Sequence, residues 1–262
     1  MSSGHAPIVV SGAADRVTMV TRGVLLAITV GAWVHVVSSP GAHGDMVMEE
    51  SPATLAAATA YVVGWAVMMA AMMLPSALPM VALYAVIQRS AGTAGPRGVP
   101  VALFTLVYLG LWAATGVPVY VASTLLEDVE SDLLSYALAL LLVAAGIYQM
   151  SPLKQVCLRA CRSPLGFLLG RWRPGLLGSL ALGWSHAVYC VGCCWALMVV
   201  LVAAGAMGLA WVLLIAVLVT AEKLLPHGEW IARGAGAALV LLGLAVALRP
   251  DLTMLLRHGH VM

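Results

Sequence analysis

Long, uninterrupted apolar stretches constrain the fold of this chain more than any other feature. A hydrocarbon core of about 30 Å is crossed by about 20 residues of α-helix. Apolar stretches of that length fill most of the chain, which is 62% hydrophobic and 9% charged. Stretches of about 18 or more such residues indicate helices, because an unpaired backbone polar group is costly in hydrocarbon. The sequence therefore predicts an all-α, polytopic transmembrane helical bundle.

We expect seven spans, and a six-span arrangement is the alternative. The predicted spans cover residues 17–38, 58–87, 99–124, 133–150, 175–204, 207–224 and 230–248. This pattern divides the chain into three parts. Residues 1–57 hold the first span and an outer loop, residues 58–248 form a transmembrane metal-binding domain, and residues 249–262 are a short tail.

The charged residues predict an orientation in the membrane. With seven spans, nearly all Lys and Arg outside the C-terminal tail fall on one side, which the positive-inside rule assigns to the cytoplasm. Two loops without Lys or Arg fall on the other side, and they hold Asp45, Glu49, Glu50, Glu127, Asp128, Glu130 and Asp132. The predicted location is the cell's inner (plasma) membrane, with the N-terminus in the cytoplasm. Arg249 and Arg257 break the pattern and favour the six-span alternative.

The second and fifth predicted spans carry most of the side chains that can bind a metal. The fifth span holds His186, Cys190, Cys193, Cys194 and Met198, and the second holds Met68, Met69, Met72 and Met73. Residues three or four apart share one face of a helix, so each set forms a stripe. Pro75 and Pro79 follow the methionines and predict a kink there. If the two spans are neighbours, we expect the stripes to meet near the middle of the membrane.

These donors indicate a soft metal ion. Thiolate and thioether ligands favour copper(I), whereas mixed cysteine and histidine sets also suit zinc. His186 is either a ligand or a proton acceptor. Glu222 and Lys223, at the end of the sixth predicted span, are accessory candidates that can also simply pair at the cytoplasmic face. Cys157 and Cys161, on a predicted interfacial segment, are a weaker candidate for copper transfer. The alternative for every one of these side chains is ordinary packing.

Three motifs resemble a known family. They are Met68-Met69-Ala70-Ala71-Met72-Met73-Leu74-Pro75, Cys190-Val191-Gly192-Cys193-Cys194-Trp195 and Glu222-Lys223-Leu224-Leu225-Pro226. They resemble a bacterial family of predicted metal-binding integral membrane proteins, built on a domain of unknown function, some of whose members are labelled copper chaperones. The resemblance covers roughly residues 60–245, and it implies that the three motifs belong together.

Three functions compete. The first is a membrane copper chaperone or transporter, whose partner is a copper donor or a copper-dependent membrane enzyme. The second is an intramembrane thiol-disulfide electron carrier using Cys190 and Cys193. The third is a structural or assembly subunit of a membrane enzyme complex. No catalytic motif is recognisable, so we expect no enzyme activity. The net charge of +2 is too small to indicate a nucleic-acid partner. The apolar spans predict the lipid bilayer as the large partner.

Overall fold

In a computed structural model of the chain, the described residues are 12–38, 55–90, 98–126, 131–203 and 209–249. Their regular secondary structure is α-helical, with no β-strand within these ranges. The helices are α1 (Gly12–Ser38), α3 (Leu55–Ser90), α4 (Val99–Ala114), α5 (Gly116–Leu126), α6 (Ser131–Met150), α7 (Pro152–Arg162), α8 (Pro164–Arg171), α9 (Gly175–Ala203), α10 (Leu209–Leu224) and α11 (Gly228–Leu248). The predicted all-α fold is confirmed.

Six segments of the described chain are long and apolar enough to cross a membrane. They are Thr18–Ser38, Leu55–Arg89, Val99–Leu125, Leu133–Met150, Gly175–Val202 and Gly228–Leu248. The third combines α4 and α5, which a turn at Thr115 separates. The chain is therefore a polytopic membrane protein, and six of the seven predicted spans are confirmed.

The remaining predicted span, the sixth (residues 207–224), corresponds to α10, which is shorter than the candidate spans. Its 16 described residues extend about 24 Å at 1.5 Å per residue. That length is less than the hydrocarbon thickness of about 30 Å. The described part of α10 is therefore shorter than a full crossing. Most of the two acidic loops lies outside the described residues. The C-terminal tail beyond Arg249 lies outside them entirely.

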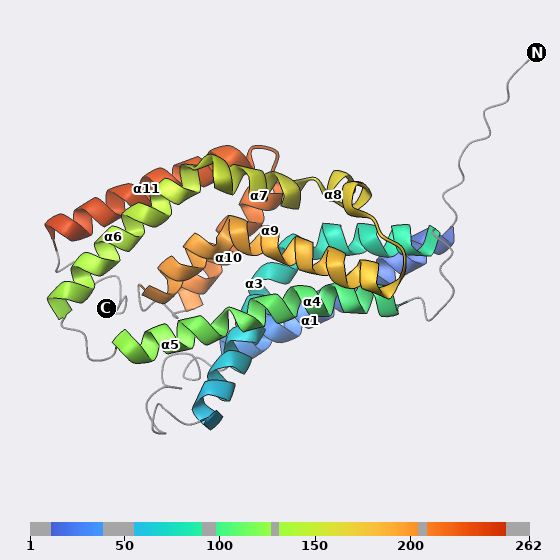
Figure 1. Ribbon diagram of the computed structural model, residues 1–262, viewed down its shortest axis with the longest axis horizontal. Coiled ribbons are helices and arrows are strands. Elements are labelled where there is room, and N and C mark those ends of the chain that lie inside the picture. The colour runs from blue at the N-terminus through green and yellow to red at the C-terminus, as the bar shows by residue number, and fades with distance from the viewer. Residues whose placement is uncertain (1–11, 39–54, 91–97, 127–130, 204–208, 250–262) are drawn as a thin grey trace, which may run out of the picture.

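Pairs of helices build the bundle (Figure 1). α6 and α11 lie side by side, α1 packs along α3, and α4 packs against both α3 and α9. α10 contacts α3, α9 and α11. α6 and α11 approach closely because glycines face each other. A Cβ added at Gly146 would lie 2.5 Å from the carbonyl oxygen of Gly236, and such small residues let membrane helices touch through their backbones.

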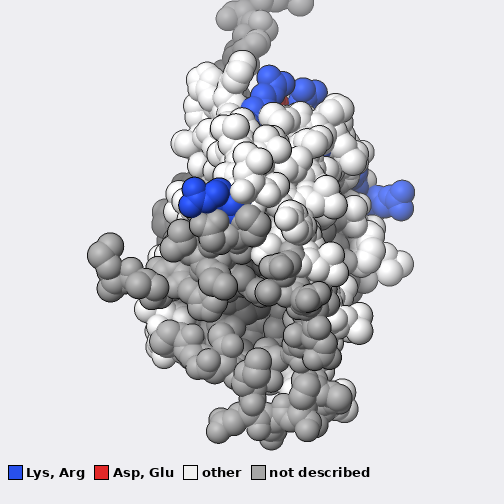
Figure 2. All heavy atoms as spheres, turned by 90° about the vertical axis from the view of Figure 1, so that its left-hand side faces the viewer, with Lys and Arg blue, Asp and Glu red and all other residues white. Residues whose placement is uncertain are grey.

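α3 provides the centre of the bundle. It changes direction along its length in Figure 1, and Pro75 and Pro79 lie inside it, as the predicted kink requires. Met68 to Leu74 are all buried along its middle turns. The outer surface is apolar, with exposed side chains such as Leu140, Leu177 and Leu241. On the face shown in Figure 2, the charged side chains of the described residues gather in a few places, and most of the described surface there is uncharged. Such a surface suits lipid.

α7 is the amphipathic helix predicted between the fourth and fifth spans. Ser151 caps its N-terminus by accepting a hydrogen bond from the Lys154 backbone N–H at 3.2 Å. Leu153 and Val156 are exposed, whereas Leu158 is fully buried. α7 packs across α9, so its buried side faces the helix that carries the cysteines.

Candidate metal centre

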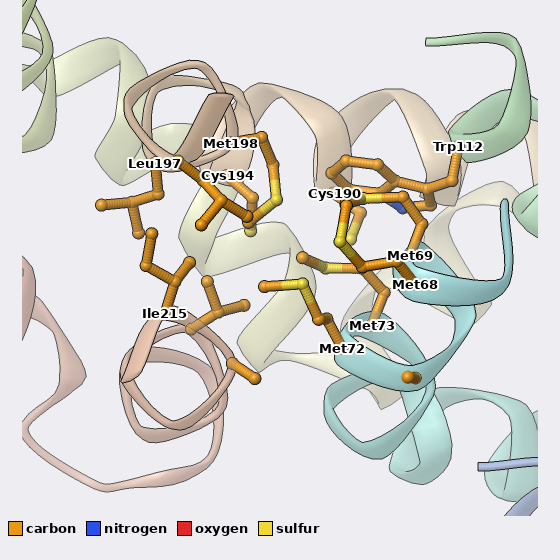
Figure 3. Close-up of a cluster of buried hydrophobic side chains, with 14 of the residues drawn as sticks. Met68, Met69, Met72, Met73, Trp112, Cys190, Cys194, Leu197, Met198 and Ile215 are labelled. Carbon is orange, nitrogen blue, oxygen red and sulfur yellow. The ribbon is translucent and has the colours of Figure 1, made fainter. Parts of the chain in front are cut away.

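The two sulfur-rich stripes meet inside the bundle. One buried cluster contains Met68, Met69, Met72 and Met73 from α3 together with Cys190, Cys193, Cys194 and Met198 from α9. None of these eight side chains is more than 4% exposed. Figure 3 shows the methionines reaching from α3 towards the side chains of α9, with Trp112 of α4 and Ile215 of α10 beside them. The predicted meeting of the two stripes is confirmed. We call these eight side chains the sulfur cluster.

Within the sulfur cluster, Cys193 and Cys190 each have thiol neighbours on α9 and also interact with Cys161 on α7. Its Sγ lies 3.3 Å from the Sγ of Cys194 and 3.2 Å from the carbonyl oxygen of Cys190, to which it donates. It also lies 3.9 Å from the Sγ of Cys161 on α7. All five cysteines of the chain are free thiols. Cys193 therefore connects the sulfur cluster to a thiol on another helix.

Cys190 has polar partners in addition to these thiols. The Nζ of Lys223 donates to its Sγ at 3.1 Å, and the hydroxyl of Tyr108 on α4 lies 3.2 Å from the same sulfur. Lys223 also donates to the hydroxyl of Ser76 on α3 at 3.1 Å. Lys223 is only 6% exposed. A buried cation beside the sulfur stabilises negative charge there, and negative charge is what a metal-binding thiolate carries.

Glu222 has a different partner from its neighbour Lys223. Its carboxylate pairs with the ammonium of Lys154 at 2.6 Å and accepts from the side-chain amide of Gln149 at 2.8 Å. Lys154 also donates to Gln149, which closes the network. Glu222 and Lys154 are 1% and 0% exposed. The alternative in which Lys223 extends to the surface is therefore wrong. Both are buried, and each takes its partner from another helix.

His186 lies one helical turn before Cys190 but in a different environment. Its ring stacks on those of Phe104 and Tyr108, with centroid distances of 5.8 and 5.2 Å, and meets the edge of Phe167 at 5.7 Å. Neither ring nitrogen has a hydrogen-bond partner, although the side chain is only 2% exposed. An unsatisfied buried polar group costs about 1–3 kcal/mol. The free nitrogens leave His186 able to bind a ligand, and no sulfur of the cluster contacts it among the described interactions.

The described residues contain no group of three or more His, Cys, Asp or Glu side chains placed to hold a metal ion. The donors that do lie together are thiols and thioethers from α3 and α9. A metal bound there would depend on methionine sulfur as well as cysteine sulfur. That donor set suits copper(I) better than zinc, because zinc sites use Cys, His and carboxylate ligands.

Sequence reasoning missed four residues of this region. Tyr108, Ser76, Lys154 and Gln149 each supply a polar group to the buried network. Lys154 was predicted to be an interfacial cation. The sequence offered one signal for this network, which is Gln149 near the end of an apolar span. A polar side chain inside a membrane span needs a hydrogen-bond partner.

The thiols of α7, outside the spans, favour their neutral form. Burial raises the pKa of the Cys157 thiol above its ordinary value. A hydrogen bond with Cys190, together with burial, raises the pKa of the Cys161 thiol well above its ordinary value. Both side chains are half-buried. Each would release a proton on binding a metal ion.

Comparison with known proteins gives one match. The family model PpoB2, described as a copper chaperone, matches residues 62–246. The match includes the sulfur cluster, α7 and the Glu222-Lys223 pair. No curated protein and no solved structure matches this chain.

Proposed function

Because this chain belongs to the PpoB2 copper chaperone family, we propose that it binds copper(I) in the sulfur cluster and passes the ion on within the membrane. The observation that carries this proposal is the meeting of four methionines from α3 with three cysteines and a methionine from α9 in one buried cluster. Soft donors of this kind favour copper(I) over hard ions, which require oxygen ligands.

Charge balance supports copper(I) in such a place. A monovalent ion bound by one thiolate is formally neutral, whereas an isolated charge in an apolar interior is very costly. Cys190 is the first candidate for a thiolate, because Lys223 donates to its sulfur. The ammonium of Lys223 adds one positive charge, which a second thiolate in the cluster would balance. Thioethers add donors without adding charge. Copper loading would release the protons of any thiols that become ligands.

The proposed orientation follows from the charged residues. Lys and Arg on one side of the bundle support a cytoplasmic N-terminus and an inner-membrane location under the positive-inside rule. The proposed partners are a copper donor and a copper-dependent membrane enzyme. The chain acts in this proposal as a binding protein without catalysis of its own, and chaperone and transporter roles share the same site.

The first experiment measures copper bound to the detergent-purified protein by mass spectrometry under reducing conditions. A variant with Cys190→Ser, Cys193→Ser and Cys194→Ser is measured beside the native protein. We expect about one copper per chain in the native protein and none in the variant, because thiolates are the only anionic soft ligands in the cluster. A control variant, Trp195→Phe, changes a partly exposed side chain on the same helix and should keep its copper.

Two results would contradict the proposal. Equal copper in the triple variant and the native protein would show that the ion binds elsewhere. A native protein that binds no copper, but forms and breaks a disulfide reversibly, would favour the electron carrier instead.

A further inference from the structure

α7 places a half-buried thiol against the sulfur cluster. The Sγ of Cys161 lies 3.9 Å from the Sγ of Cys193, which is 1% exposed. Cys161 is also flanked by Arg159, which is exposed, and by Arg162, which is partly exposed. The two thiols therefore join a polar edge of the molecule to its sulfur-rich interior.

Polar contacts at both ends of α7 hold it in this position. Arg162 donates to the carbonyl oxygens of Leu225 and Pro226 at 2.8 and 2.6 Å, in the turn between α10 and α11. Lys154, at the other end of α7, makes the buried ion pair with Glu222. Two thiols on helices anchored in this way keep their separation without a covalent link.

The separation fits a shared metal ion. At 3.9 Å the two sulfurs are unbonded thiols in contact, since a disulfide bond is about 2.05 Å long. A thiolate lies about 2.3 Å from a bound zinc ion. Taking that value for a soft metal, two sulfurs 3.9 Å apart would subtend roughly 115° at a shared ion. That angle is close to trigonal, and it leaves a position open for a third ligand.

We propose that Cys161 and Cys193 form a two-thiolate copper(I) exchange site, through which the ion passes between the polar edge of α7 and the sulfur cluster. This inference rests on the proposed function. Copper stays copper(I) throughout, and no electron is transferred. Metal–sulfur bonds form as the two thiols release their protons to water at the half-exposed edge. The bond to Cys161 then breaks as donors of the sulfur cluster replace it, while Cys193 belongs to both sites.

Cys157 provides a matched control. It is a half-buried thiol one turn earlier on the same helix, but it packs against Gly192, where an added Cβ would lie 2.8 Å from its sulfur. It has no sulfur neighbour among the described contacts. Cys157→Ser and Cys161→Ser thus make the same chemical change on the same helix, and only the second removes a thiol that faces Cys193.

The test loads detergent-purified protein with copper(I) and then follows removal of the ion by an excess of a water-soluble copper(I) chelator in a stopped-flow instrument. We expect Cys161→Ser to retain the native copper content but to lose copper at least about tenfold more slowly, equivalent to about 1.4 kcal/mol in the barrier. Cys157→Ser should release copper at the native rate. Helical content by circular dichroism should be the same in all three proteins.

Each outcome has one meaning. A native release rate in Cys161→Ser would overturn the exchange site while leaving the proposed function intact. Equal slowing in both variants would also overturn it, because the effect would then belong to α7 as a whole. A native protein that takes up no copper would instead remove the proposed function on which this inference rests.

Discussion

Removing one charge from the buried ion pair should be far more destabilising than removing both. Glu222 and Lys154 lie 2.6 Å apart and are 1% and 0% exposed. At an effective dielectric constant of about 20, unit charges at this distance attract by roughly 6 kcal/mol, which offsets the cost of taking them out of water. Glu222→Gln keeps the shape but leaves the ammonium of Lys154 uncompensated. Loss of one partner of a buried pair typically costs about 3–5 kcal/mol.

The assay is the free energy of unfolding in detergent micelles, from denaturant titrations followed by tryptophan fluorescence and circular dichroism. We expect Glu222→Gln and Lys154→Met each to lose about 3–5 kcal/mol. The double variant should lose much less than the sum, because neither charge then remains buried. The matched control is Glu229→Gln. The Arg159–Glu229 pair lies 3.4 Å apart with side chains 68% and 37% exposed, so its loss should cost less than about 1 kcal/mol.

Two results would refute this reasoning. If the single losses added in the double variant, the two charges would not be coupled in the folded protein. If Glu222→Gln cost no more than Glu229→Gln, water would reach the pair, and its burial would not describe the protein in micelles.

Three further predictions concern other parts of the molecule. Replacing Met69, Met72 and Met73 with Leu keeps the volume nearly constant, so the fold should persist while copper(I) affinity, measured by competition with a chelator, falls; unchanged affinity would mean that these methionines only pack. Because burial raises the pKa of Cys157, less of its reactive thiolate is present at neutral pH, and its alkylation rate should keep rising with pH beyond the ordinary thiol pKa; a plateau at the ordinary value would contradict this. Gly146→Ala should cost about 1–3 kcal/mol of stability by forcing α6 and α11 apart, since the new Cβ would meet a backbone oxygen at 2.5 Å; native stability in the same titration would show that the helices adjust freely.

The spans were predictable because the constraint on them is local. Each stretch must satisfy its own backbone hydrogen bonds in hydrocarbon, whatever its neighbours are. For this reason five of the six candidate spans lie within two residues of their predicted limits at both ends, and the second, longer span Leu55–Arg89 begins three residues earlier than predicted. α10 is the exception. Its apolar composition resembles that of a span, but the part of this helix that the structure describes is 16 residues long, which is less than a full crossing.

The sulfur stripes were also predictable, since residues three or four apart share a helix face. Their meeting required an added assumption that α3 and α9 are neighbours. In the structure α4 packs against both helices, and the long methionine side chains reach across between them. The partner of Cys193 on α7 followed from no pattern, because Cys161 is 32 residues away in the chain.

The sequence by itself determined that this chain is a bundle of membrane helices and that two of its spans carry soft metal ligands on one face. Residue type and helical period suffice for both conclusions, because both are properties of single helices. Only the tertiary structure decided that Glu222 pairs with Lys154, that Lys223 contacts Cys190, and that Cys161 faces Cys193. The physical reason is that lipid and protein interior are equally apolar, so composition does not mark which faces of a membrane helix meet.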